Sequence, residues 1–288
     1  MPNVVAIMNA KGGVGKTTVS MMLADGLAYY KKARVLLIDA DPQSSLSYAR
    51  LGEFGMEKID PVKIDEEIDL DKPTLHGKTL PDLLVSLSRD TLKAIPKEFI
   101  HEESGNISNG SSADLLPNSP RLAITERRFQ SDETIFSSMK TLISIVSQKY
   151  DWVIIDCSPS ITRFSEAWLE VADLQIIPVK PDYMSRTSLI VLTALRGAAS
   201  IRGRKLATPL GMIATMVRNI PSHNTFIDNL RRNNKRDLFF EVIKERDGIA
   251  KSAQWSDEPQ PFVGKYSGDG NQYIVGITNE FLHRVKNI

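Results

Sequence analysis

Short, continuous apolar runs alternate with helical patterns along most of the chain. Residues 4–8 are apolar and end in a glycine-rich turn. Such a run is typical of a strand that is buried on both faces, as in a parallel sheet. Apolar residues at helical spacing then cover 17–30, and a second apolar run follows at 35–38. The chain is therefore predicted to open with a strand–helix–strand unit.

The same alternation continues to the end of the sequence. Further strands are predicted at 152–155, 174–179 and 210–217, with a helix over 188–201 between two of them. Residues 272–285 place apolar side chains four apart, which predicts a closing helix packed on the sheet. Repeated units of this kind predict an α/β fold with a doubly wound, mostly parallel sheet and helices on both faces.

Residues 52–118 are less regular than the rest. They carry mixed charge and a polar tract rich in Ser, Asn and Gly at 104–112. We expect an elaborated helix-and-loop region there, with a mobile stretch near 102–112. Because neither an internal repeat nor an interdomain linker is visible, residues 1–288 are predicted to form a single domain.

Composition narrows the class of protein. The 288 residues are 42% apolar and 25% charged, with a net charge of +1, so any contact with nucleic acid needs a local basic patch. The single cysteine, Cys157, excludes an intrachain disulfide and fits a reducing compartment. The opening apolar run is too short for a signal peptide, and no stretch of about 18 apolar residues occurs. We expect a cytoplasmic protein.

A glycine-rich loop joins the first strand to the first helix. Its glycines allow successive backbone N–H groups to surround phosphate oxygens, and the helix N-terminus adds partial positive charge. Lys16 would meet the β- and γ-phosphates, and the Thr17 hydroxyl would bind Mg²⁺. Ala10 stands where the general P-loop pattern has glycine, so the loop is a variant. The candidate nucleotide-binding residues are Lys11, Gly12, Gly13, Val14, Gly15, Lys16, Thr17 and Thr18.

The loop begins with Lys11 and reads Lys-Gly-Gly-Val-Gly-Lys-Thr. It resembles the deviant Walker A motif of the ParA/MinD family of P-loop ATPases. Further segments match that family in order: 39–43 (switch I), 114–117 (Asp-Leu-Leu-Pro), 151–160 (Walker B and switch II) and 172–179 (the next strand). The resemblance covers essentially the whole chain and is closest to Soj-type partitioning ATPases without an N-terminal helix-turn-helix.

The resemblance implies roles for particular residues. It implies ATP and Mg²⁺ as cofactors, with Lys11 reaching across a homodimer to the partner's ATP. Lys16 stabilises the transferring phosphoryl group, and Asp41 orients the attacking water. Asp39 and Asp156 support Mg²⁺ together with Thr17. These roles fit phosphoryl transfer, which depends mostly on positioning and charge neutralisation. The resemblance further implies that hydrolysis is slow and stimulated by a partner. The resemblance also implies that adenine is read near 210–217 and 243–247.

Many ParA dimers bind DNA without sequence preference, which requires Lys and Arg side chains that contact phosphates. The alternative is that such residues belong to an ordinary solvated surface, where nearby acidic side chains balance their charge. Because the loop begins at residue 11, we do not expect an N-terminal operator-binding domain. The candidate DNA-binding residues are Arg202, Arg204, Lys205, Arg218, Arg231, Arg232 and Lys235.

The leading hypothesis is a nucleoid-associated ATPase that segregates a plasmid, a chromosome or a protein cargo with a ParB-like or other adaptor. One alternative is a MinD-like membrane switch, although the apolar residues of 281–288 continue the spacing of the preceding helix, which favours core packing. The other is an ATP-dependent synthetase on the same fold, against which Lys11 argues. Cys157 is predicted to be core, because an iron–sulfur cluster shared by two subunits needs two cysteines from each.

Overall fold

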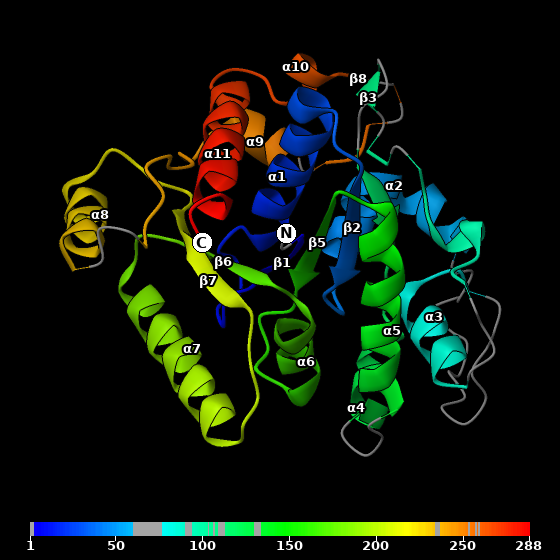
Figure 1. Cartoon of the computed structure of the whole chain (residues 1–288). Helices are drawn as coiled ribbons and strands as arrows, with labels where there is room; N and C mark the ends of the chain where they lie inside the picture. The colour runs from blue at the N-terminus through cyan, green and yellow to red at the C-terminus, as the bar shows by residue number, and fades with distance from the viewer. Residues whose placement is uncertain are drawn as a thin grey trace.

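The computed structural model describes residues 3–59, 77–89, 94–102, 104–105, 107–108, 113–129, 134–233, 237–252, 254–256, 258 and 260–288. Its centre is a six-stranded sheet in the order β4-β2-β5-β1-β6-β7 (Figure 1). Every pairing in this sheet is parallel. The strands are β1 (Val4–Ile7), β2 (Val35–Ala40), β4 (Asp114–Leu116), β5 (Trp152–Cys157), β6 (Leu174–Val179) and β7 (Thr208–Ala214).

Helices cover both faces of the sheet, because successive strand residues point to opposite sides. Val4 and Ala6 pack with the helices of one layer, and Val5 and Ile7 pack with those of the other. The first layer contains α3 (Leu80–Ser88), α4 (Leu122–Phe129), α5 (Thr134–Lys149), α6 (Arg163–Val171), α7 (Tyr183–Ile201) and α8 (Pro221–Asn233). The second contains α1 (Lys16–Lys31), α2 (Ser45–Ile59), α9 (Asp247–Ser252), α10 (Phe262–Lys265) and α11 (Gly270–Val285). The doubly wound α/β prediction is confirmed.

The region at 52–118 contributes more order than the sequence indicated. Asp114–Leu116 forms β4 and extends the main sheet beside β2, whereas the sequence placed it in an irregular elaboration. Part of the stretch predicted to be mobile, near 102–112, lies outside the described residues. Ile107–Ser108 forms β3, which pairs with β8 (Gln260–Pro261) away from the main sheet, and a short 3₁₀ turn, η1, covers Lys97–Phe99.

Two other element boundaries differ from the predictions. Helix α7 begins at Tyr183, five residues before the predicted start, because Asp182 caps it by accepting a hydrogen bond from the Ser185 amide. Strand β7 ends at Ala214, and Val217 instead pairs with Lys244 in an isolated bridge. Cys157 is fully buried at the end of β5, as predicted. No helix in the described part of the chain is long and apolar enough to cross a bilayer.

This topology decides where the candidate residues meet. In a parallel sheet all strands end at the same edge, and ligands bind in the crevice outside those ends. Strands β2, β5, β1 and β6 are consecutive neighbours. Asp39 and Asp156 lie near the ends of β2 and β5, and the segments that follow the strands carry the glycine-rich loop, Asp41 and Asp182. These groups therefore gather at one edge.

Candidate nucleotide site

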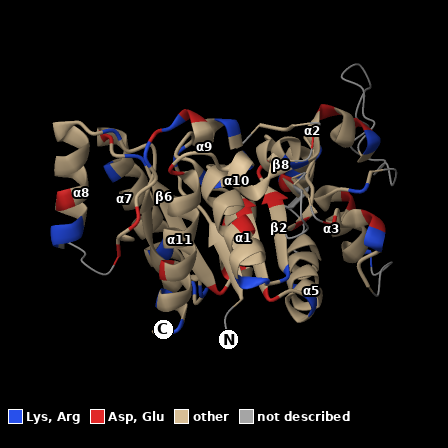
Figure 2. Cartoon of the chain, turned by 90° about the horizontal axis from the view of Figure 1, so that it is seen from above, with Lys and Arg blue, Asp and Glu red and all other residues tan. Residues whose placement is uncertain are grey.

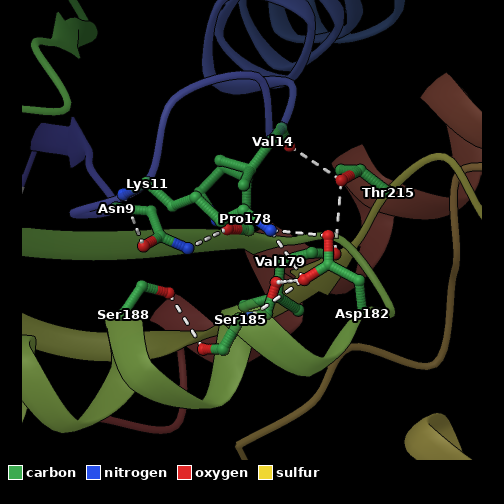
Figure 3. A network of polar contacts seen from close by, with 9 residues as sticks. All are labelled: Asn9, Lys11, Val14, Pro178, Val179, Asp182, Ser185, Ser188 and Thr215. Atoms are coloured by element: carbon green, nitrogen blue, oxygen red, sulfur yellow. Dashed lines mark hydrogen bonds and ion pairs between the residues drawn. The ribbon is translucent and has the colours of Figure 1, made fainter.

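The glycine-rich loop has the backbone conformation that a phosphate-binding loop requires. Gly13 has φ 67° and Gly15, the N-cap of α1, has φ 79°. These left-handed conformations are costly for residues with a Cβ atom, so glycine is needed at both positions. The Val14 side chain is buried, and the Val14 carbonyl accepts a 2.7 Å hydrogen bond from the Thr215 hydroxyl just after β7 (Figure 3). Thr215 thus anchors the loop, a role that the sequence did not reveal.

Lys16 begins α1 with its side chain in the interior of the site. The residue is only 7% exposed, and burial lowers the pKa of its amine, while Asp156 and Asp41 partly offset that effect. Its Nζ atom lies 3.4 Å from the carbonyl oxygen of Lys11, at the start of the loop. A partly desolvated ammonium within the loop is suited to bind a highly charged anion such as a polyphosphate.

Thr17, the next residue, contacts the end of β5. Its hydroxyl donates a 2.7 Å hydrogen bond to Asp156 Oδ2, and the Ser20 hydroxyl donates to Asp156 Oδ1 at 3.0 Å. Asp156 is 1% exposed, and burial raises its pKa to about 6 despite these hydrogen bonds. The predicted metal-supporting pair Thr17 and Asp156 is therefore brought together.

Asp39 stands beside Asp156 on the neighbouring strand. The two residues are register partners across β2 and β5, and both are buried. Burial, together with the negative charge of Asp156, raises the pKa of Asp39 to about 7. Two buried carboxylates and a hydroxyl are hard oxygen donors of the kind that Mg²⁺ prefers. The described residues hold no group of three or more His, Cys, Asp or Glu side chains that could bind a metal ion by themselves. This donor set fits a Mg²⁺ ion that also takes ligands from phosphate or water.

Asp41 follows two residues later and is only half-buried. Its carboxylate accepts a 3.0 Å hydrogen bond from the Gln43 amide, and its own amide donates to Asp39 Oδ1 at 3.2 Å. It is close enough to Lys16 to contribute to the electrostatics of that amine. The structure thus places it at the edge of the loop, with its carboxylate accessible to solvent.

Lys11 is held by an ion pair within its own chain. Its Nζ atom contacts both carboxylate oxygens of Asp182, at 2.6 and 2.5 Å (Figure 3). Burial opposes ionisation of Asp182, but the hydrogen bonds from Lys11 and Ser185 outweigh it and lower its pKa. Asp182 therefore serves two groups at once: it caps α7 and it neutralises Lys11. No motif in the sequence pointed to this residue.

The two segments predicted to lie near adenine are adjacent. The Val217 amide donates to the Ile243 carbonyl at 3.0 Å, and the Glu245 amide donates to the Val217 carbonyl at 3.0 Å. A cavity of about 720 Å³ lies beside this junction, between it and α8. Its lining includes Arg218, Asn219 and Glu245.

The basic candidates for DNA binding do not form one uniform patch. Arg204 is paired with Glu166 at 2.6 Å and Glu170 at 2.9 Å, and Arg218 is paired with Glu245. Arg202 and Lys205 are exposed beyond the end of α7, and Lys235 lies outside the described residues. Arg231 and Arg232 are exposed in the last turn of α8, where Figure 2 shows a basic segment at the helix end.

Comparison with known proteins agrees with this geometry. A family model described as an AAA domain matches residues 2–197. The sporulation initiation inhibitor protein Soj of Bacillus subtilis is 31% identical over 220 residues, which is 75% of this chain and 74% of Soj. The chain belongs to the ParA/MinD family. It spans 60%, 74% and 50% of the lengths of the first three curated relatives that it matches.

Solved structures share the fold of this ParA/MinD family member. Apo McdA of Cyanothece has a TM-score of 0.71 and 22% identity, with 96% of this chain and 98% of that one covered. Cobyrinic acid a,c-diamide synthase of Mycobacterium smegmatis, with bound ADP and magnesium, has a TM-score of 0.72 and 19% identity, with 99% and 96% covered. Because both identities are below 25%, the likeness establishes the fold alone.

Proposed function

We propose that this chain is a ParA-type ATPase that binds Mg-ATP, forms a homodimer around it, and uses slow hydrolysis to position a cargo. The observation that carries the proposal is the arrangement at the strand ends. The glycine-rich loop, whose Gly13 and Gly15 have positive φ angles, and the buried Lys16 lie beside Thr17 and the carboxylates of Asp39 and Asp156. These are the components that phosphoryl transfer requires for positioning and charge neutralisation.

In this proposal, different residues of the chain bind the phosphates, the Mg²⁺ ion and the attacking water. Backbone N–H groups of the loop and the Lys16 amine bind the phosphates. Thr17, Asp39 and Asp156 hold Mg²⁺, which supplies charge neutralisation when it is bound. The half-exposed Asp41 carboxylate orients the attacking water, consistent with its place at the rim of the loop.

In the proposed dimer, the Lys11 amine acts across the interface between the two subunits. A cation supplied across an interface would act on the partner's nucleotide in the manner of an arginine finger. In the single chain this amine is bound to Asp182 at 2.5 Å, so it must leave that carboxylate to reach across. Assembly of the dimer therefore exchanges one ion pair within the chain for contact with the partner's phosphates.

The proposed cycle continues with DNA and an adaptor. The ATP-bound dimer binds nucleoid DNA without sequence preference through exposed basic residues, with those at the end of α8 as the main candidates. A ParB-like or other adaptor then stimulates hydrolysis and releases the dimer. The cargo is a plasmid, a chromosome or a protein assembly.

Membrane targeting through the last helix is disfavoured by its packing. Ile274, Ile277 and Phe281 of α11 are fully buried in the layer shared with α1. Placing this apolar face in a bilayer would separate it from its core partners and expose the apolar surface that it covers. We therefore retain the partitioning function and not the MinD-like switch.

The direct test is ATP binding and hydrolysis by the purified chain and by Lys16→Ala. Wild type is expected to bind ATP with Mg²⁺ and hydrolyse it slowly, whereas Lys16→Ala loses binding or turnover. The control is Lys31→Ala, which removes an exposed amine at the other end of the same helix and should leave both unchanged. Normal turnover in Lys16→Ala would refute the assignment of the loop. Rapid turnover that depends on an added small molecule would favour a synthetase.

A further inference from the structure

The segment that follows β4 runs beside the turn that follows β2. The two strands are parallel neighbours, with Leu36 opposite Asp114 and Ile38 opposite Leu116. Parallel strands end at the same edge, so Pro117 and Asn118 leave the sheet next to Asp39 and Asp41. The Asp-Leu-Leu-Pro motif therefore delivers Asn118 to the nucleotide site, although the proposed chemistry uses none of its residues.

Asn118 is linked by hydrogen bonds to both carboxylate-bearing residues of this turn, to Asp41 directly and to Asp39 through Ser47. Its Nδ2 donates a 2.7 Å hydrogen bond to the backbone carbonyl of Asp41. Its backbone amide donates a 2.8 Å hydrogen bond to the Ser47 hydroxyl, which in turn donates a 2.6 Å hydrogen bond to Asp39 Oδ2. One residue thus fixes the Asp41 backbone directly and the Asp39 carboxylate through Ser47.

The carbonyl that Asn118 holds closes the turn. The Asp41 carbonyl also accepts a 2.8 Å hydrogen bond from the Ser44 amide, and Ser44 has φ 52°. A left-handed conformation at a residue other than glycine is costly and persists only where its surroundings enforce it. The bond from Asn118 Nδ2 is one such restraint, because rotation of this peptide unit would break it and would redirect the Asp41 side chain.

The Asn118 side chain is buried with its acceptor atom unpaired within the described part of the chain. The residue is 0% exposed, and its Oδ1 atom has no hydrogen-bond partner among the described residues. Leaving a buried acceptor unpaired costs roughly 1–3 kcal/mol. An apolar side chain would avoid that cost but would lose the donor to Asp41, so the donor is the feature that the site uses.

We propose that Asn118 is a positioning residue: it holds the Asp41 turn so that the Asp41 carboxylate meets the attacking water. This inference rests on the proposed function, in which Asp41 has that role. It predicts that Asn118 affects turnover only through Asp41. Nucleotide affinity should not depend on it, since its hydrogen bonds within the described part of the chain go to Asp41 and Ser47 and not to the glycine loop.

The test compares Asn118→Ala with Ser119→Ala. Asn118→Ala is expected to lower kcat about tenfold or more, because small misplacements of reacting groups have large effects. The Kd for ATP should stay within about twofold of wild type, as expected for an interaction that acts after binding. Ser119 is the matched control: its hydroxyl is equally buried and has no hydrogen-bond partner among the described residues, so Ser119→Ala should leave kcat unchanged. The nearly isosteric Asn118→Leu, which also lacks the donor, replaces Asn118→Ala if that variant does not fold.

A double-mutant cycle separates positioning from a general structural effect. In the Asp41→Ala background, Asn118→Ala should lower single-turnover hydrolysis no further, because the side chain that it positions is gone. A loss of the same factor in both backgrounds would overturn the proposal. So would an unchanged kcat in Asn118→Ala.

Amide hydrogen exchange keeps the inference testable if the wild-type chain proves not to hydrolyse ATP. That outcome would refute the proposed function, but not the inference that Asn118 holds the Asp41 turn in place. Without nucleotide, Asn118→Ala should accelerate exchange of the Ser44 amide, which donates to the carbonyl that Asn118 holds. Ser119→Ala should not. If the Ser44 amide exchanges as slowly in Asn118→Ala as in wild type, Asn118 does not hold the turn, whatever the ATPase assay shows.

Discussion

Replacing Asp39 by Asn should make the nucleotide-free chain more stable, and by an amount that grows with pH. Burial and the charge of Asp156 raise the pKa of Asp39 to about 7, from its ordinary value of 3.8. A carboxyl whose pKa is raised on folding is ionised first in the unfolded state. It therefore lowers the free energy of unfolding as pH rises from the unfolded pKa to the folded one.

The magnitude follows from this difference. At about 1.4 kcal/mol for each pH unit, the raised pKa of Asp39 lowers the free energy of unfolding by roughly 2 kcal/mol at pH 5, where the folded-state carboxyl is still protonated, and by roughly 4 kcal/mol at pH 8, where it is ionised. Asparagine avoids this cost and can still accept the hydrogen bonds from Ser47. It places an NH₂ group where Oδ1 now accepts the Asp41 amide, which loses about 1 kcal/mol. The net gain is therefore roughly 1 kcal/mol at pH 5 and roughly 3 kcal/mol at pH 8.

Urea unfolding at the two pH values, with EDTA and without nucleotide, measures this gain. Asp41→Asn is the matched control, because it removes a carboxylate from the same turn at a position that is only half-buried. Asp39→Asn should also lose Mg²⁺-dependent hydrolysis. A difference in stability between Asp39→Asn and wild type that is equal at pH 5 and pH 8 would refute the reasoning.

Four further results are expected. Lys11→Ala should abolish the ATP-dependent dimer, measured by size-exclusion chromatography with light scattering; a retained dimer would contradict the role in trans. Asp182→Ser keeps a capping oxygen for α7 but frees Lys11, so it should shift dimerisation to several-fold lower ATP concentration, and an unchanged midpoint would show that the ion pair does not compete. Asp41→Ala should bind ATP and dimerise but hydrolyse poorly, and wild-type turnover would remove Asp41 from the mechanism. Arg231→Glu combined with Arg232→Glu should weaken DNA binding at one fixed salt concentration, while equal affinity would place the DNA-binding surface elsewhere.

The sequence predicted those parts of the molecule in which local pattern and chemistry coincide. The apolar runs at 4–8 and 174–179 are strands because buried parallel strands need apolar side chains on both faces. The glycines of the loop, Lys16 and Thr17 were found because their spacing is fixed by the phosphates they would surround. Family membership and fold are both confirmed.

What the sequence missed depends on contacts between distant segments. Strand β4 has three residues, too few for a periodic signal, and becomes a strand because β2 offers it an edge. Asp182 and Thr215 lie about 170 and 200 residues beyond the loop that they hold, and Ser47 and Asn118 are 71 residues apart. None of these residues has a distinctive spacing, so only the folded arrangement identifies them.

The charges buried at this site have a common consequence. Burial lowers the pKa of Lys16 and raises those of Asp39 and Asp156, so each group resists the charged form in which it would bind Mg-ATP. Phosphates and Mg²⁺ favour the charged forms and reverse these shifts. Ligand at a thousand times its Kd adds about 4 kcal/mol of stability, similar to the cost of ionised Asp39 at pH 8. The fall in stability between pH 5 and pH 8 should therefore disappear when Mg²⁺ and a non-hydrolysable ATP analogue saturate the site. If the fall persists unchanged under saturation, the buried carboxylates do not bind the metal in their ionised form.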